Sequence, residues 1–123
     1  MKDSATTREL IQQYYDLISQ KGNWQSLIAD KITFTSVGNI TYTKDAYVEA
    51  TSRFLQVVTS LKINEFIVEN DKACITVEYG LQSPKGNTAS CEVAEVLMIK
   101  DDKINSSCIF FDTAAFRSFM AQG

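Results

Sequence analysis

Apolar and polar residues alternate along two stretches of the chain, 88–100 and 103–111, which are separated by the turn Asp101-Asp102. Alternation is typical of β-strands, because every second side chain of a strand lies on the same face. The pattern therefore predicts two long strands joined in a hairpin. One face of the first strand is apolar except for Glu95; the other members of this face are Cys91, Val93, Leu97 and Ile99.

Glu95 is the first candidate for function. A carboxylate on the core face of a sheet must find a partner, find water or stay protonated, because burying an unpaired charge is costly. Burial would raise its pKa, and the side chain could then donate or shuttle a proton. Two alternatives stay open: a structural acid bonded to Tyr15 or another hydroxyl, and a face assignment that is wrong by one residue.

Apolar residues at helical spacing occupy the beginning of the chain. Thr6 and Glu9 have the spacing of a capping box, so a helix is predicted to begin near Thr6 and to end at Gly22. Asn23 is expected to cap a second, short helix that contains Trp24. These elements would pack their apolar side against the rest of the chain.

A third helix is predicted to begin at the cap residue Thr43 and to carry a broad apolar face as far as Leu61. Asp112 is expected to cap a short last helix. Further strands are predicted at 32–37, 62–69 and 72–82, with a break at Gly38-Asn39. Helices early and strands late indicate an α+β fold, in which an antiparallel sheet curls around the long helix. The length of 123 residues fits one domain, 1–123.

Charge and composition exclude several classes of partner. The net charge is −3 and no basic run is present, which argues against nucleic acid, whose phosphates require clustered lysine and arginine. No run of about twenty apolar residues could span a membrane. The residues after Met1 do not form a signal peptide, so a cytoplasmic protein without a membrane partner is expected.

The histidine and cysteine content limits the metal sites and nucleophiles that the chain could form. The chain has no histidine, and its three cysteines, Cys74, Cys91 and Cys108, lie far apart and form no CxxC motif. A zinc site would need an unusual set of ligands, and serine–histidine or cysteine–histidine pairs are excluded. Any acid or base must be Asp, Glu, Tyr, Lys or Cys. No metal and no cofactor are expected.

Four short segments resemble proteins of the nuclear transport factor 2-like superfamily, which includes SnoaL-like polyketide cyclases, ketosteroid isomerases and limonene epoxide hydrolases. The segments are Ile11-Gln12-Gln13-Tyr14-Tyr15, Gly22-Asn23-Trp24, Asp102-Lys103-Ile104 and Phe110-Phe111-Asp112. The resemblance covers nearly the whole chain. It implies a cone-shaped, cystatin-like α+β roll with a pocket between a curved sheet and the helices, and a small apolar or carbonyl-containing ligand.

The resemblance to ketosteroid isomerases implies roles for two residues, but the general base of these enzymes has no counterpart here. Tyr15 matches the oxyanion-hole tyrosine, and Glu95 matches the second oxyanion-hole acid, which stays protonated. Both could donate hydrogen bonds to a developing enolate. The general-base aspartate of these enzymes falls on or near Ser36, which disfavours ordinary ketosteroid isomerisation.

The limonene epoxide hydrolase pattern is also incomplete. These enzymes use an Asp-Arg-Asp arrangement, of which Glu95 could replace one acid. Val93 stands at the arginine position and Ile109 at the second aspartate. The resemblance gives Asp112 the structural role of a helix cap.

The catalytic candidates are therefore Glu95 and Tyr15. A pocket of this kind would be lined by apolar and aromatic side chains with a few hydroxyls. The candidate ligand-binding residues are Trp24, Phe34, Ser36, Phe54, Val58, Tyr79, Val93, Leu97, Ser107, Ile109 and Phe111.

The opposite face of the last two strands carries an unusually apolar set: Ala94, Val96, Met98, Cys108 and Phe110. Such a face normally marks an interface, and the resemblance implies the same, so a homodimer through the outer sheet face is predicted. Three functions stay open. The chain could be an acid–base isomerase or cyclase that works without a metal, a non-catalytic ligand-binding protein, or a dimeric association module.

Overall fold

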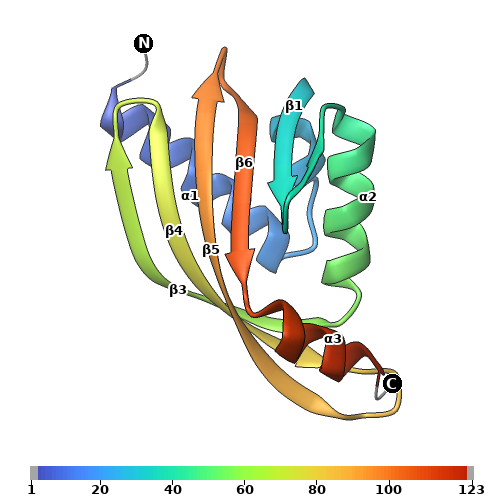
Figure 1. Cartoon of the computed structure of the whole chain (residues 1–123). Helices are drawn as coiled ribbons and strands as arrows, with labels where there is room; N and C mark the ends of the chain where they lie inside the picture. The colour runs from blue at the N-terminus through green and yellow to red at the C-terminus, as the bar shows by residue number, and fades with distance from the viewer. Residues whose placement is uncertain (1–2, 122–123) are drawn as a thin grey trace.

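The computed structural model describes residues 3–121, and Figure 1 shows how their helices and strands are arranged. The helices are α1 (Ser4–Ser19), the 3₁₀ helix η1 (Trp24–Leu27), α2 (Lys44–Leu55) and α3 (Thr113–Ala121). The strands are β1 (Ile28–Ser36), β2 (Asn39–Thr41), β3 (Val58–Glu69), β4 (Lys72–Gln82), β5 (Thr88–Lys100) and β6 (Lys103–Phe111). No helix within residues 3–121 is long and apolar enough to cross a membrane.

The six strands form one strongly curved sheet in the order β2-β1-β6-β5-β4-β3 (Figure 1). The α+β class and the cone-like curvature are confirmed. One part of the prediction was wrong, because β1 and β6 run parallel, with Phe34 opposite Ser107. Alternation along a strand reports which face is buried, but it does not report the direction of the neighbouring strand. The sheet is therefore mixed.

Strand β2 was not predicted. The turn lies one residue earlier than the break predicted at Gly38-Asn39, because the positive φ angles are 52° at Val37 and 82° at Gly38. Two successive positive φ angles suit the tight turn of a two-residue hairpin, and glycine adopts such an angle without steric cost. The chain thus reverses here and pairs β2 with β1, and β1 itself begins at Ile28 rather than at residue 32.

Two helix caps and the end of α2 differ from those predicted from the sequence. Asp3, and not Thr6, caps α1, since its side chain accepts a hydrogen bond of 2.8 Å from the Thr6 amide. Asn23 precedes η1 but makes no side-chain capping bond. Helix α2 ends at Leu55, and the apolar residues from Val58 onward belong to β3.

Two predicted caps are confirmed. The Thr43 hydroxyl accepts a hydrogen bond of 3.1 Å from the Ala46 amide at the start of α2. The Asp112 carboxylate accepts one of 2.9 Å from the Ala115 amide at the start of α3. Both side chains satisfy amide groups that the first turn of a helix leaves without an internal partner.

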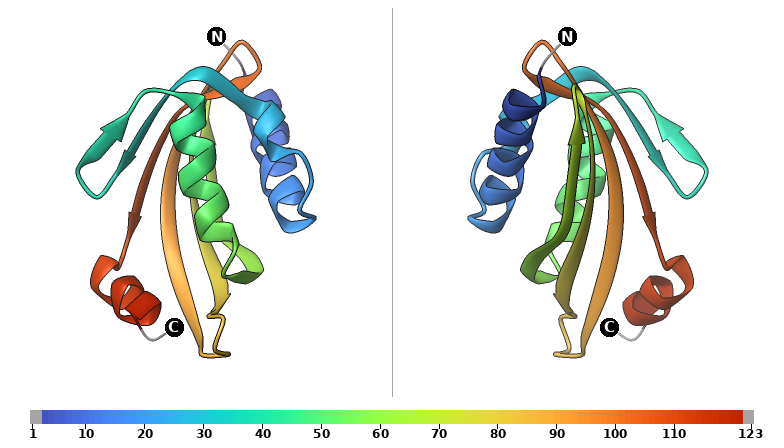
Figure 2. Two further views of the ribbon diagram at one scale, coloured as in Figure 1. Left: turned by 90° about the vertical axis from the view of Figure 1, so that its right-hand side faces the viewer. Right: turned by 90° about the vertical axis from the view of Figure 1, so that its left-hand side faces the viewer.

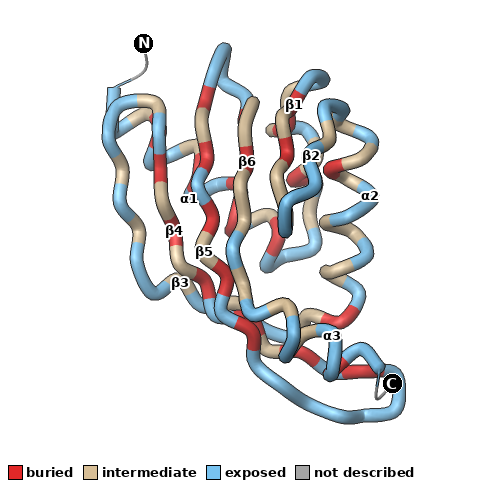
Figure 3. Tube along the Cα trace, viewed as in Figure 1, coloured by how far each residue is buried: buried red, intermediate tan, exposed pale blue. Residues whose placement is uncertain are grey.

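The helices enclose one side of the sheet. Helix α1 packs on β3 and β4, whereas α2 packs against β1 (Figure 2). Helix α3 lies at the far end of the molecule from the N-terminus, beside the turn between β4 and β5 (Figure 1). Buried and more exposed residues alternate along β4 and β5, as Figure 3 shows. The buried face of β5 is the face predicted from the sequence. It includes Glu95, which is only 6% exposed.

Candidate functional site

A cavity of about 380 Å³ opens between α2, α3 and the inner face of the sheet. Its size falls within the range of roughly 300–1,000 Å³ that is typical of small-molecule sites. Most of its wall is apolar, and Glu95 is the one acidic residue among the described lining residues. The lining residues that come from the strands and from the turn between β1 and β2 are Phe34, Ser36, Val37, Asn39, Thr41, Tyr79, Cys91, Val93, Glu95, Ile109 and Phe111.

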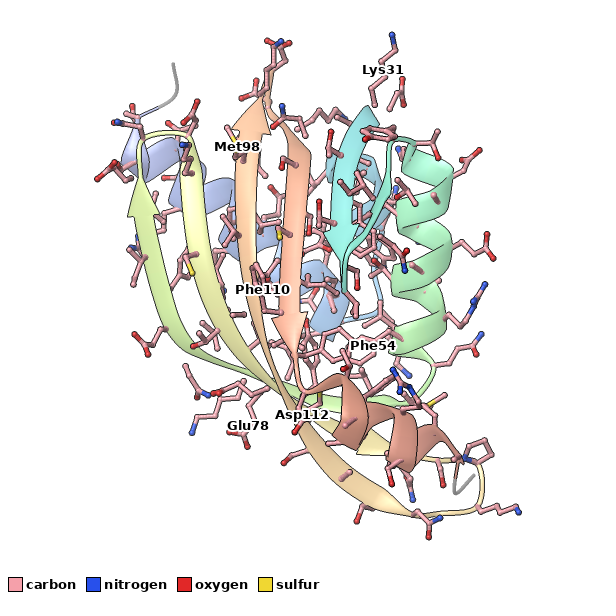
Figure 4. The ribbon with its side chains drawn as sticks, in the orientation of Figure 1. Lys31, Phe54, Glu78, Met98, Phe110 and Asp112 are labelled. Carbon is pink, nitrogen blue, oxygen red and sulfur yellow. The ribbon has the colours of Figure 1, made fainter. Side chains whose placement is uncertain are left out.

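Helix α2 forms the opposite wall with one face. Tyr47, Ala50, Thr51 and Phe54 recur at the spacing of one helical face and all line the cavity. Phe54 packs edge-on against Tyr79 of β4, with ring centroids 5.0 Å apart, and also contacts Phe116 of α3. Figure 4 shows Phe54 where α2 approaches α3. The aromatic contacts hold both helices over the sheet.

Three hydroxyl groups surround the Glu95 carboxyl group. The Tyr15 hydroxyl, from α1, donates a hydrogen bond of 2.5 Å to Oε1. The Ser107 hydroxyl, from the adjacent strand β6, donates one of 2.7 Å to Oε2. Tyr47 of α2 approaches the same oxygen at 3.4 Å, which is the longest of the three contacts. The acid therefore joins α1, α2 and the sheet.

Burial controls the protonation of this cluster. Removal from water raises the pKa of Glu95 above its ordinary value, although the bonds from Tyr15, Ser107 and Tyr47 act in the opposite direction. Burial also raises the pKa values of Tyr15 and Tyr47, so both remain protonated donors. Compared with water, the site thus shifts Glu95 toward the neutral carboxyl group, which is the form that has a proton to donate.

Tyr47 is the functional candidate that the sequence did not single out. Its hydroxyl lies 2.5 Å from the Tyr14 hydroxyl, and both tyrosines line the cavity next to Glu95. Both tyrosines lie on the apolar face of a helix, a position that by itself favours a role in the core. The available signal was the hydroxyl itself, since a fully buried tyrosine needs a hydrogen-bond partner.

The structure brings together most of the residues singled out from the sequence. Besides Glu95, the following line the cavity: Phe34, Ser36, Phe54, Tyr79, Val93, Ile109 and Phe111. Tyr15 and Ser107 contact Glu95 without lining the cavity.

Three further candidates lie elsewhere. Trp24 packs edge-on against Tyr14 and Tyr47 and supports the wall from outside. Leu97 is completely buried in the core, and Val58 begins β3, where it pairs with Leu81. Within residues 3–121, no three Cys, Asp or Glu side chains gather in a way that could hold a metal ion.

No family model matches the sequence, and no curated protein matches it. Solved structures do match the fold. A candidate SnoaL-like polyketide cyclase from Jannaschia sp. superposes with a TM-score of 0.84 at 9% identity, over 100% of this chain and 96% of the other. A nuclear transport factor 2-like protein of unknown function from Burkholderia pseudomallei gives 0.79 at 12% identity, over 94% and 97%.

A third similar structure is that of TerC crystallised with polyporic acid, with a TM-score of 0.75 at 18% identity, over 92% of this chain and 96% of the other. At sequence identities this low, structural similarity shows a shared fold and not a shared activity. The three α-helices and the curved mixed sheet of residues 3–121 match these structures over nearly the whole chain. This protein therefore has the cone-shaped fold of the nuclear transport factor 2-like superfamily.

Proposed function

We propose that this protein binds a small, mostly apolar molecule that carries a carbonyl group, and that Glu95 acts on that group as an acid. The observation that carries the proposal is the buried carboxyl group in the wall of an otherwise apolar cavity. A neutral acid in such a wall can donate a hydrogen bond to a carbonyl oxygen, where few other donors compete. TerC, a protein of similar fold, was crystallised with polyporic acid.

Glu95 would serve as the catalytic acid, with Tyr47 as a second donor from the opposite wall. Transfer of the Glu95 proton to the carbonyl oxygen would form the O–H bond of the enol and leave a carboxylate. The enol would be complete when a water molecule in the cavity takes a proton from the carbon next to the carbonyl group. The hydroxyls of Tyr15 and Ser107 would then stabilise this carboxylate, since hydrogen bonds to a charged acceptor are the stronger ones. In this scheme Tyr15 is a positioning residue, because it contacts Glu95 and does not line the cavity.

A second candidate function is ligand binding without catalysis. The specific observation is the lack of a base: Ser36, Val93 and Ile109 occupy the wall, and Glu95 is the single carboxyl group among the described lining residues. Removal of a proton from carbon would then depend on water in the open cavity. A binding protein needs no such step.

Binding can be tested with 2-acetylnaphthalene and with 2-ethylnaphthalene, which has a similar shape but no carbonyl group. We expect the acetyl compound to bind about tenfold more tightly at a pH below the pKa of Glu95. The preference should decrease as the pH rises through that pKa. In Glu95→Gln the preference should not depend on pH, because the amide does not titrate. Equal affinities for the two compounds at every pH would overturn the proposal.

Catalysis can be separated from binding by proton exchange in heavy water. If Glu95 promotes enol formation, the wild-type protein should accelerate deuterium incorporation into the acetyl methyl group, and Glu95→Gln should not. Nuclear magnetic resonance measures the incorporation directly. Saturable binding without accelerated exchange would favour the non-catalytic alternative.

We also infer that two copies associate through the outer face of the sheet. Phe110 pairs with Ala94, and Cys108 pairs with Val96, so these side chains form a continuous apolar patch. Phe110 is 59% exposed, and Figure 4 shows it on the outer side of β6, with Met98 farther along β5. An apolar patch can pair with the same patch of a second copy across a two-fold axis, which would remove it from water.

A further inference from the structure

The cavity has opposite chemical character at its two ends. Glu95 lies beside Tyr47, which belongs to the first turn of α2. Near the other end is Arg53, in the last turn of α2, and it is the sole cation among the described lining residues. The wall between them is largely apolar. A ligand that fills the cavity would therefore have its carbonyl group and its opposite end in different electrostatic environments.

Arg53 is available for a ligand. The one ion pair that the structure records for it is with Glu49, one helical turn earlier, and the two side chains are 71% and 70% exposed. Exposed pairs at this spacing contribute little to stability, because water and salt screen them. A carboxylate brought to Arg53 by a ligand that is already held in the cavity would compete well with Glu49.

The neighbours of Arg53 at this end are apolar. Phe54 and Leu55 follow it in α2, and Phe116 and Met120 face the same cavity from α3. Guanidinium groups bind carboxylates with two parallel hydrogen bonds, and the apolar stem of arginine packs well on such surroundings. The Arg53 side chain can thus contribute both apolar contacts, through its methylene groups, and a positive charge at the opening of the cavity.

Helix geometry gives the axial spacing of Tyr47 and Arg53. Tyr47 and Arg53 belong to the same helix, and at the usual rise per residue they stand about 9 Å apart along its axis. A rigid two-ring molecule with polar groups at its opposite ends spans a distance of this order. Arg53 is turned away from Tyr47 around the helix axis, so its long side chain would have to reach across the opening to meet the second polar group of such a ligand.

We propose that the ligand is an amphipathic organic anion, with its carbonyl group at Glu95 and Tyr47 and its carboxylate at Arg53. This inference rests on the proposed function, since it specifies the class of molecule that the same cavity binds. It also explains how a chain with a net charge of −3 would accept an anion: the local positive charge stands at the opening and the rest of the wall is uncharged except for Glu95.

The test compares 6-acetyl-2-naphthoate with the neutral 2-acetylnaphthalene by calorimetry. In the wild-type protein the naphthoate should bind about tenfold more tightly, an advantage that should decrease as salt is added. Arg53→Gln should remove this advantage and leave the affinity for 2-acetylnaphthalene within about twofold. Arg53→Lys should restore part of it, because lysine keeps the charge but not the two-pronged geometry.

Two control variants separate recognition from general charge effects. Arg117→Gln removes an exposed arginine that is adjacent to Phe116 in α3 but does not line the cavity, and it should leave the ratio of the two affinities unchanged. Glu49→Gln removes the competing carboxylate and should strengthen binding of the naphthoate alone. Thermal unfolding of each variant shows that it is folded.

The possible failures can be told apart. If both compounds bind and Arg53→Gln leaves the ratio of their affinities unchanged, Arg53 does not recognise the anion and this inference is overturned, while the proposed function stands. If 2-acetylnaphthalene shows no preference over 2-ethylnaphthalene, the proposed function fails and this inference fails with it.

Discussion

Glu95 has a charge state that is set by competition between burial and hydrogen bonding. Three hydroxyls point at its oxygens, and each of them would be a better partner for a carboxylate than for a neutral acid. Burial acts against the charge and prevails, so the pKa is raised. A carboxyl group in this balance can release a proton to a ligand and still find its charge stabilised afterwards.

The raised pKa predicts how stability depends on pH. A group whose folded-state pKa lies above its unfolded value contributes stability that is complete below the unfolded pKa, near 4.3, and is lost as the pH rises through the folded pKa. Glu95→Gln does not titrate at this position. The free energy of unfolding of the variant, minus that of the wild type, should therefore increase between acidic and neutral pH. The increase should be about 1.4 kcal/mol for each pH unit that separates the folded pKa from the unfolded one.

This difference can be measured by urea denaturation of both proteins at a series of pH values. Subtracting the two curves removes the contributions of the other carboxylates, which both proteins share. A difference that stays constant with pH would mean that Glu95 titrates normally in the folded protein.

Cys91 offers an independent reporter of occupancy. It lines the cavity, whereas Cys74 and Cys108 are partly exposed on strands β4 and β6 and do not line it. Saturating 2-acetylnaphthalene should slow alkylation of Cys91 by iodoacetamide about tenfold at ten times its dissociation constant, since only the free protein reacts. The rates at the other two cysteines should not change. Mass spectrometry of the peptides gives all three rates, and equal slowing at every cysteine would point to a global effect.

At the level of single residues, the sequence predicted the position of Glu95 because alternation along a strand specifies its face directly. It also allowed the Tyr15–Glu95 bond as one alternative, and the structure shows that bond. The role of Tyr47 could not be predicted in this way. Its partners lie on α1 and β5, and the rotation of α2 that aims its hydroxyl at them depends on packing between distant segments.

The secondary-structure elements differ in how strongly local sequence determines them. The bounds of β4, β5 and β6 agree with the prediction, because their alternation is long and their turns contain Asn70-Asp71 or Asp101-Asp102. Helix ends were less well predicted, since several residues near α1 could act as its cap. The parallel pairing of β1 with β6 joins segments far apart in the chain, and no local pattern encodes it.

The start of α1 gives a test at the level of an element. Asp3 caps the helix, and the Thr6 side chain makes no capping bond there, so Asp3→Ala should reduce the free energy of unfolding by about 1 kcal/mol. Thr6→Ala should have an effect near zero, because alanine has a high helix propensity. Chemical denaturation of the two variants measures both values. A larger loss for Thr6→Ala would instead support the capping box expected from the sequence.

At the scale of the whole molecule, the sheet has one face in the core and one apolar patch outside. Light scattering at micromolar concentration should give the mass of two chains. Phe110→Glu places a charge in the centre of the patch and should reduce the mass to that of one chain. Tyr42→Glu, which changes a similarly exposed aromatic residue outside the patch, should leave the dimer intact. A wild-type protein with the mass of one chain would contradict the inferred association.

The parallel pairing of β1 with β6 also affects how the protein can be made. Ile28 has its partner at Ile104, so one of the first strands to leave the ribosome must wait for the last one before that edge is paired. Contacts between such distant segments slow folding, because a long loop has to close before they form. Until then the apolar inner face of the sheet stays exposed to water and to other chains. A fragment that stops before residue 103 lacks β6 and should therefore not form a stable folded structure.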